Sequence, residues 1–371
     1  MTHLRDILDV NELEAALERG LVRIRRDAAS GLATLNYTPE AQYKGIWTDV
    51  TRQCRGLVIE GEIDEAVVVA RPFAKFGNLG EYGTGSAMGE IPWGADLTVT
   101  EKLDGSLISG AMVEDAVRLC SRKSLDGWQG EAANALWRAH YAGLSWPEGV
   151  TPVFEYVSPA NRVVVRYERE DLVLLGAIDI ASGADVEWAE WPGPRARVVE
   201  IRDGKDLGAA LASDEENAEG FVLRFTEDPG RPSVRVKAKF AQYVEAHRVA
   251  TMTSELTIWE SLRSGRGVER VLELAPDELY GFVERTAAEL TARHRELLAR
   301  ARDVAESVAG MGRKEAAARV LAVKDVNHSL VFAVLDGREN VEEIAWKDLR
   351  PRGDEGRGAL VSGAAFRTAS E

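Results

Sequence analysis

One lysine stands out for the chemistry it could perform: Lys102, which lies between two strand-like segments and is followed by Asp104 and Gly105. A deprotonated lysine amine is a nucleophile, whereas an arginine stays protonated near neutral pH. The chain uses lysine sparingly, because only 10 of its 46 cationic side chains are lysines. Lys102 is therefore a candidate nucleophile.

Three further cations, Arg235, Lys237 and Lys239, alternate with apolar residues in the segment 233–239. Side chains two positions apart share one face of a strand. Like charges on one face repel one another, so this face favours an anion. A solvated amphipathic strand is the alternative interpretation.

Two glutamates occupy positions in or beside predicted strands. Glu155 shares a face with Val153 and Val157, so its carboxylate is costly to bury unless something binds it. For Glu155 the alternative is an edge strand on which the carboxylate faces water. Glu219 stands at the mouth of another predicted strand.

Two more cations have distinctive neighbours. Arg55 and Gly56 lead into an apolar strand, and Lys75 lies between Phe73 and Phe76. An ordinary solvated charge is the alternative for Arg55. For Lys75 the alternative is an alkyl chain over an aromatic patch, with the amine in water.

A lysine nucleophile, cations for phosphate and carboxylates for a divalent ion are together the groups needed for attack on the α-phosphate of a nucleotide. The two cysteines and five histidines lack metal-ligand spacing. A metal would therefore be held by carboxylates and by the phosphates of a substrate, which suits magnesium better than zinc.

The composition is that of a globular protein with two or three domains, since the 371 residues are 45% hydrophobic and 29% charged. No apolar run is long enough for a membrane span, and the first residues lack the apolar region of a secretory signal, so we expect a cytoplasmic protein. The net charge of -15 argues against nonspecific coating of nucleic acid but allows a local basic groove.

Short β-branched and aromatic runs dominate residues 20–250, with one helical segment at 130–142. So many strands with few helices between them predict an α+β domain of antiparallel sheets with flanking helices. The predicted strands are 55–60, 66–71, 97–102, 106–113, 117–121, 152–157, 162–167, 171–180, 220–225 and 233–239.

Helical patterns replace strands after residue 250. Apolar residues recur every three to four positions in 277–308, which predicts a long helix. Gly, Arg, Asp and Ser dominate from residue 351, which predicts a flexible tail. The remaining predicted helices of this all-helical domain are 252–263, 313–322, 326–335 and one near 341–347.

Four motifs occur in a fixed order, namely Lys102-x-Asp-Gly, Phe154-Glu-Tyr, Glu219-Gly-Phe and Lys237-Ala-Lys. In this order and spacing the chain resembles the covalent nucleotidyltransferase superfamily. Within residues 35–250 it is most similar to phage-type ATP-dependent RNA ligases of the tRNA-repair kind, the RNA ligase 1 family. The more specific matches are Cys54-Arg-Gly, Arg71-Pro-Phe-Ala-Lys-Phe-Gly-Asn, Lys102-x-Asp-Gly-Ser-Leu and Ser158-Pro-Ala-Asn-Arg-Val-Val.

The resemblance implies a domain organisation. Residues 1–250 would form the adenylyltransferase, or nucleotidyltransferase (ATP-grasp-like ligase), domain, including an N-terminal subregion. Residues 251–350 would form the all-helical C-terminal domain and act as an RNA-specificity module, and residues 351–371 would be a flexible tail.

The resemblance also implies a reaction. Lys102 would attack the α-phosphate of ATP and form lysyl-AMP, with release of pyrophosphate. The AMP would move to an RNA 5′-phosphate, and a 3′-hydroxyl would then displace it to seal the strand. Lys237 and Lys239 would contact the α-phosphate and favour the deprotonated amine of Lys102, while Arg55 and Lys75 would bind the triphosphate or the RNA phosphate.

The carboxylates receive roles in the same way. Glu155 would hold the ribose of ATP, and Glu219 would act in catalysis by binding or orienting Mg²⁺ or Mn²⁺. Asp104 is a second candidate metal ligand and, with Gly105, shapes the turn after the nucleophile.

Three residues keep open roles. The segment 119–124 matches the next family motif loosely, with Arg122 or Lys123 where a lysine is expected. His247 fits a family-like pattern after Lys239, and a packed or solvent-facing histidine is the alternative. The implied partners are RNA with 5′-phosphate and 3′-hydroxyl ends, cleaved tRNA among the candidates, and an end-healing kinase or phosphatase.

Rival interpretations share some of these motifs. DNA ligases and capping guanylyltransferases also carry Lys-x-Asp-Gly and Lys-x-Lys, but a strand-rich OB-fold domain usually follows them, and here helical patterns follow instead. A nick-sealing RNA ligase of the other phage type is a further alternative. From another class, the chain could be a nucleotide- or RNA-binding relative that has lost catalysis.

Overall fold

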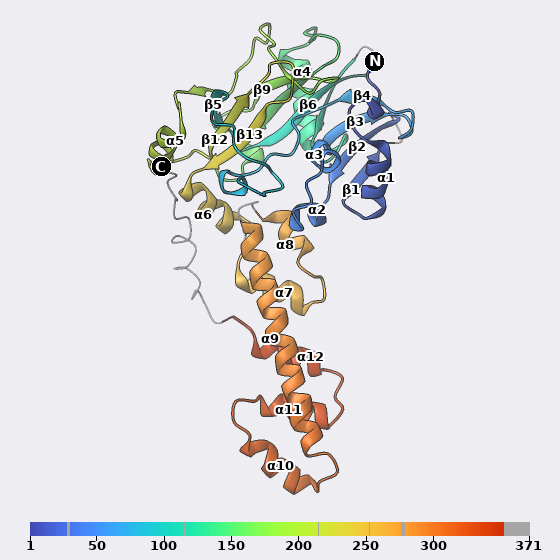
Figure 1. The fold of residues 1–371 in the computed structure, drawn as a ribbon, viewed down its shortest axis with the longest axis vertical. Helices are drawn as coiled ribbons and strands as arrows, with labels where there is room; N and C mark the ends of the chain where they lie inside the picture. The colour runs from blue at the N-terminus through green and yellow to red at the C-terminus, as the bar shows by residue number, and fades with distance from the viewer. Residues whose placement is uncertain (28–29, 114–115, 214, 252, 276–278, 352–371) are drawn as a thin grey trace. The chain divides into compact units, whose positions relative to one another are not determined.

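The computed structural model describes residues 1–351, except 28–29, 114–115, 214, 252 and 276–278 (Figure 1). The chain divides into two compact units between residues 251 and 252, and each unit is described by itself. The predicted tail at 351–371 lies outside the described residues, apart from its first position.

The first unit begins with a four-stranded sheet in the order β1-β2-β3-β4. Its core is made of fully buried aliphatic side chains, among them Leu13, Leu35 and Leu57. Asp9 caps the first helix by accepting a hydrogen bond from the amide of Glu12 at 3.1 Å. The elements are α1 (Val10–Glu18), β1 (Val22–Arg26), β2 (Leu32–Tyr37), α2 (Pro39–Tyr43), α3 (Asp49–Gln53), β3 (Arg55–Glu60) and β4 (Val67–Ala70).

The second sheet has five strands in the order β10-β9-β8-β6-β7. Every residue of β8 is buried, because β8 is flanked by β9 and β6 and is covered on both faces. On one face, Trp137 of α4 packs with Phe154, Trp188 and Trp191. The elements are β6 (Ser106–Val113), β7 (Ala116–Ser121), α4 (Trp128–His140), β8 (Val150–Val157), β9 (Asp171–Asp179) and β10 (Asp185–Val186).

The third sheet has the order β11-β5-β12-β13. Val236 and Ala238 of β13 are buried with Phe221 of β12, Leu207 of α5 and Tyr243 of α6 on one face. The elements are β5 (Asp96–Lys102), β11 (Val198–Val199), α5 (Gly204–Ala212), β12 (Gly220–Thr226), β13 (Val234–Lys239) and α6 (Ala241–Ala250). All the strand pairs in these three sheets are antiparallel, so the predicted α+β fold is confirmed.

The predicted strand at 162–167 is wrong, because this segment has no regular secondary structure. The amides of Val164 and Val165 donate to the carboxylate of Asp104, each at 2.8 Å, instead of to a neighbouring strand. The amide of Arg166 likewise donates to the side chain of Asn217 at 2.7 Å. Hydrogen bonds to side chains thus take the place of the backbone hydrogen bonds to a neighbouring strand that β-branched residues alone would suggest.

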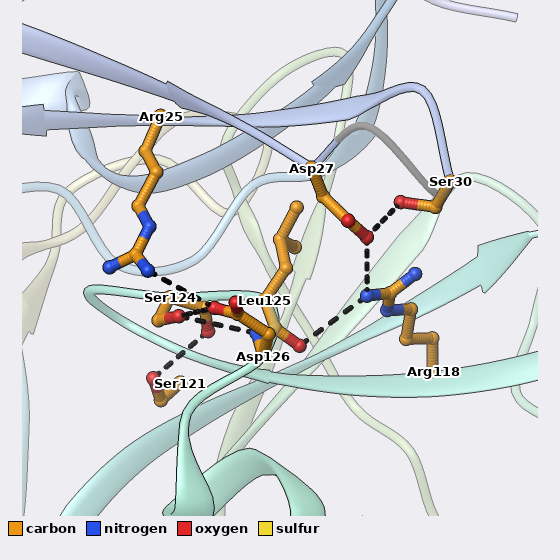
Figure 2. Close-up of polar contacts among 8 residues, drawn as sticks. All are labelled: Arg25, Asp27, Ser30, Arg118, Ser121, Ser124, Leu125 and Asp126. Carbon is orange, nitrogen blue, oxygen red and sulfur yellow. Dashed lines mark hydrogen bonds and ion pairs between the residues drawn. The ribbon is translucent and has the colours of Figure 1, made fainter.

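A cluster of polar side chains joins the first sheet to the outer strand of the second (Figure 2). Arg118 of β7 lies 2.9 Å from Asp27, just beyond β1, and Arg25 of β1 lies 3.4 Å from Asp126. We call these four residues the clasp. Asp126 belongs to the loop between β7 and α4, so the clasp ties the loop that carries Arg122 to the first sheet.

The second unit is all-helical, as the sequence predicts. Buried residues of the long helix α9 contribute to two cores, one around Trp259 and one around Leu330. No helix among the described residues is both long and apolar enough to cross a membrane. The helices are α7 (Glu255–Arg263), α8 (Glu269–Leu274), α9 (Tyr280–Ser307), α10 (Arg313–Ala322), α11 (His328–Leu335) and α12 (Val341–Asp348).

Candidate active site

The third sheet places the ends of three strands in one row. Its register aligns Lys102, the last residue of β5, with Gly220 of β12 and with Lys239 of β13. Glu219 immediately precedes Gly220, and its Oε1 lies 2.7 Å from the Nζ of Lys102 and 3.3 Å from the Nζ of Lys239. The side chain of Glu219 is only 3% exposed, so two amines share one buried carboxylate oxygen.

Gly220 makes this row possible. Its φ of 141° lies in a region that glycine favours, and a Cβ atom at this position would lie 2.1 Å from the carbonyl oxygen of Ala238. Any larger residue would push β12 away from β13 and move Glu219 with it.

Asp104 is buried two residues after Lys102 and anchors the turn that leads out of β5. Besides the two amides of Val164 and Val165, its carboxylate accepts a hydrogen bond from the hydroxyl of Tyr243 at 2.8 Å. The backbone amide of Asp104 donates to the hydroxyl of Tyr167 at 2.9 Å. The carboxylate is thus held by three donors, and its role as a metal ligand stays a prediction.

Glycine is also required directly after Asp104. A Cβ atom on Gly105 would lie 2.4 Å from the carbonyl oxygen of Tyr156 on β8. The turn therefore passes close to the second sheet, which brings the end of β5 beside the strand that carries Glu155.

Glu155 is buried on the central strand β8, so the alternative of an edge strand facing water is wrong. Burial raises the pKa of Glu155 to about 8. The positive charges of Lys102 and Arg55 lower this pKa, and the negative charges of Glu219 and Asp104 raise it further. Glu155 is consequently protonated at neutral pH.

The three cations of β13 share one face, as predicted, but their surroundings differ. Arg235 is ion-paired with Asp185 of β10 and lies over the ring of Phe73. Lys237 lies over the ring of Phe76, with its Nζ 5.4 Å from the ring centroid. The Nζ of Lys239 lies 3.3 Å from the Oε1 of Glu219.

Arg55 and Lys75 both contact aromatic rings. The guanidinium of Arg55 lies 5.4 Å from the centroid of Phe76, the ring that also receives Lys237. The Nζ of Lys75 lies 5.1 Å from the centroid of Trp47, and the residue is only 4% exposed. The alternative in which the amine of Lys75 sits in water is therefore wrong.

Arg122 and Lys123 lie in different surroundings. Arg122 donates to the hydroxyl of Tyr37 at 2.7 Å, and the ring of Tyr37 also faces the amine of Lys75. Lys123 is exposed. The structure thus brings Arg122 into the neighbourhood of Lys75. His247 lies on α6 beside Tyr243, with ring centroids 5.5 Å apart.

Sequence reasoning missed several residues that shape this site. Tyr167 and Tyr243 form hydrogen bonds with Asp104, and Asn217 accepts one from the amide of Arg166, and these bonds join segments 51 to 139 residues apart. No local pattern could have identified them. The charge on Asp104 was visible in the sequence, but its partners were not.

The electrostatics around Lys102 favour an anionic ligand. Lys102 and Lys239 share Glu219, while burial keeps Glu155 uncharged at neutral pH. Arg55 is close enough to Glu155 to oppose its raised pKa. Cations therefore outnumber anions locally, although the whole chain carries a net charge of -15.

Parts of this chain are similar to two solved structures. An archaeal ATP-dependent RNA ligase is 13% identical with a TM-score of 0.46, covering 78% of this chain and 79% of that one. The RNA ligase of Naegleria gruberi with PPi is 17% identical with a TM-score of 0.32, covering 42% of this chain and 52% of that one.

Sequence comparisons are more specific. A protein of Thermovibrio ammonificans, to which the name RNA ligase is provisionally given, is 32% identical over 217 residues. The match covers 55% of each chain, so this chain spans about half the length of that relative. A family model for RNA ligase matches residues 53–243, just over half of the chain, and this range contains all eight predicted site residues. The chain therefore belongs to this RNA ligase family.

Proposed function

We propose that this protein is an ATP-dependent RNA ligase, which joins an RNA 5′-phosphate end to a 3′-hydroxyl end through a lysyl-AMP intermediate. The observation that carries the proposal is the position of the Lys102 amine, which shares the buried carboxylate of Glu219 with Lys239. Membership of the RNA ligase family supports the choice of reaction.

In the first step, the lone pair of the Lys102 Nζ attacks the α-phosphorus of ATP. A nitrogen–phosphorus bond forms, the bond from the α-phosphorus to the pyrophosphate oxygen breaks, and the amine loses a proton. An ammonium ion has no lone pair, so the amine must first give up a proton and leave its 2.7 Å ion pair with Glu219.

The surrounding side chains have distinct tasks in nucleotide binding. Lys237 and Lys239 would bind the α-phosphate, and Arg55 and Lys75 would bind the phosphates beyond it. Glu155, protonated at neutral pH, has both a donor and an acceptor to offer a ribose hydroxyl.

Glu219 is the carboxylate that fits a divalent cation. No group of three or more His, Cys, Asp or Glu side chains that could hold a metal occurs among the described residues. Mg²⁺ is commonly held by one or two carboxylates together with substrate phosphates and water, so Glu219 with a nucleotide would be sufficient. Mg²⁺ or Mn²⁺ bound there would neutralise charge on the reacting phosphates. Asp104 holds the turn through the three donors that contact its carboxylate, and we keep it as the second candidate metal ligand.

In the second step, an oxygen of the RNA 5′-phosphate attacks the α-phosphorus of lysyl-AMP, the nitrogen–phosphorus bond breaks and Lys102 takes up a proton. In the third, the RNA 3′-hydroxyl oxygen attacks the phosphorus of the adenylylated 5′-phosphate and loses its proton; a phosphodiester bond forms, the phosphoanhydride bond to AMP breaks, and AMP leaves. We propose cleaved tRNA as the substrate, the helical unit as the source of RNA specificity, and an end-healing kinase or phosphatase as a partner that prepares the ends.

The test is covalent labelling with α-labelled ATP and Mg²⁺. We expect the wild-type protein to become labelled, and Lys102→Ala and Lys102→Arg to retain less than about 1% of that label, because neither supplies a neutral amine. Lys205→Ala, which removes an exposed lysine of α5, is the matched control and should label as the wild type does.

Three results would contradict the proposal. An unlabelled wild-type protein would exclude the lysyl-AMP reaction. Labelling from GTP but not from ATP would indicate a capping-type enzyme. Faster sealing of nicked DNA than of single-stranded RNA ends or a broken anticodon stem-loop would indicate a DNA ligase.

A further inference from the structure

The segment 161–167, which we call the bracket, begins at the last residue of a short 3-10 helix, η3 (Pro159–Asn161), and is held by hydrogen bonds to the turn that follows Lys102. Asn161 donates to the hydroxyl of Ser106 at 3.1 Å and to the carbonyl of Tyr156 at 2.9 Å. Farther along, the bracket donates two backbone amides to Asp104 and accepts the Asp104 amide on the hydroxyl of Tyr167. Because of these hydrogen bonds, the bracket and the turn after Lys102 are expected to move together.

The other end of the bracket is fastened to the start of β12. The side chain of Asn217 accepts from the amide of Arg166 at 2.7 Å and donates to its carbonyl at 3.2 Å. Asn217 has a φ of 55°, a conformation that asparagine tolerates better than most residues, and it lies two positions before Glu219. The backbone of Arg166 is thus held between Val165, whose amide donates to Asp104, and Asn217, which lies just before Glu219.

Two arginines of the bracket, Arg162 and Arg166, have exposed side chains. Neither forms an ion pair with an acidic side chain in the part of the chain that the structure describes. The next arginine, Arg169, differs because its Nε lies 3.3 Å from Asp171. The Nε of Arg162 donates to the carbonyl of Val164 at 3.1 Å, which leaves the charge of its guanidinium without an acidic partner. In a chain with 61 acidic and 46 basic residues, two guanidinium charges that no acidic side chain balances, beside the nucleophile's turn, call for an anionic partner.

We propose that Arg162 and Arg166 bind phosphate groups of the RNA strand when AMP moves from Lys102 to the RNA 5′-phosphate. The inference rests on the proposed function and adds an RNA-binding surface to it. Arginine is well suited to phosphate, because its planar guanidinium can donate two parallel hydrogen bonds. The hydrogen-bonded backbone of the bracket holds both arginines in place before RNA arrives, which reduces the entropy cost of binding.

ATP also carries phosphates, so the experiment must separate the two ligands. Lysyl-AMP formation from ATP alone is measured first. AMP transfer is then measured by mixing isolated lysyl-AMP protein with a short 5′-phosphorylated RNA, and the affinity for the same RNA is measured by fluorescence anisotropy at several salt concentrations. The variants are Arg162→Ala, Arg166→Ala and the double substitution.

We expect the double variant to form lysyl-AMP within about twofold of the wild-type rate and to transfer AMP to RNA at least about tenfold more slowly, as expected for the loss of two charge-assisted phosphate contacts. The slope of log affinity against log salt should decrease by about 0.7 for each arginine removed. Arg169→Ala and Arg231→Ala are the controls, because both remove exposed arginines that are ion-paired in the structure.

Unchanged AMP transfer and RNA affinity in the double variant would overturn the inference. An equal loss of lysyl-AMP formation would also overturn it, because the two arginines would then serve ATP. A wild-type protein that forms no lysyl-AMP would instead overturn the proposed function. The RNA affinities are measured on the unmodified protein, so they test the two arginines independently of that reaction. Because Arg166 is held through its backbone, Arg166→Ala alone should keep the melting temperature of the wild type.

Discussion

The first unit contains two clusters of cations and carboxylates that differ in exposure, because one pair of the clasp lies mostly in water while the row at Lys102 is largely buried. In the row at Lys102, the side chains of Lys102 and Lys239 are 21% and 10% exposed and share the buried carboxylate of Glu219. In the clasp of Figure 2, Arg25 and Asp126 are 60% and 64% exposed. Charges interact strongly when water is excluded and weakly when it is not, so chemistry is expected in the row and only a minor contribution to stability from the clasp.

The largest effect should come from Gly220→Ala, which breaks the row without removing any charge. The new Cβ would lie 2.1 Å from the carbonyl oxygen of Ala238, so the start of β12 must move and carry Glu219 away from Lys102. We expect lysyl-AMP formation to fall by about 100-fold or more, because misplacement by about an ångström is costly in catalysis. Covalent labelling with α-labelled ATP measures the rate of lysyl-AMP formation.

Gly208→Ala is the matched control for that substitution. Gly208 lies within helix α5, and nothing is within 4 Å of its Cβ position. Alanine in a helix stabilises by up to about 1 kcal/mol relative to glycine, so this variant should label normally and melt at the same or a higher temperature. Equal activities in the two variants would show that the close approach at Gly220 does not position Glu219.

A smaller effect should appear in the pH dependence of stability through Glu155. Its pKa is raised by burial from 4.5 in the unfolded chain to about 8 in the folded protein. Below pH 4.5 both states are protonated. Between pH 4.5 and 8 the unfolded chain ionises while the folded protein keeps its proton, so the free energy of unfolding falls as pH rises.

Glu155→Gln should remove this contribution. Because one pKa unit corresponds to about 1.4 kcal/mol, the melting temperature of the wild type should decrease by several degrees relative to the variant between pH 5 and pH 8. Glu148→Gln, at an exposed glutamate just before β8, is the control and should follow the wild type. If the melting temperatures of the wild type and Glu155→Gln changed with pH in the same way, Glu155 would be ionised in the folded protein.

The comparison also explains what the sequence could predict. Alternation placed Arg235, Lys237 and Lys239 on one face, because strand geometry is a local property. It could not show that Arg235 is committed to Asp185 or that Lys239 reaches Glu219, since those contacts depend on how distant strands pair. The charges of both clusters were visible in the sequence, but their burial was not.

Secondary structure shows the same limit. Long apolar periods predicted α9, and β-branched runs predicted most strands of the second and third sheets. The strands β1 and β2 are not predicted from the sequence, although Arg23 and Arg25 alternate with Val22 and Ile24 in a hairpin whose other strand is largely buried. The valines at 163–165 favour extended structure and predict a strand at 162–167, whereas the hydrogen bonds that its amides donate to Asp104 depend on the tertiary fold.

The smallest effect is expected from the exposed pair of the clasp, and it completes the comparison. A double-mutant cycle on Arg25→Ala and Asp126→Ala should give no measurable coupling in the melting temperature, because both side chains lie mostly in water and salt screens them. The same cycle on Arg118 and Asp27, whose side chains are 28% and 21% exposed, should give a coupling of up to about 1 kcal/mol that weakens in high salt. A larger coupling in the more exposed pair would contradict the view that burial, rather than charge alone, separates the clasp from the row at Lys102.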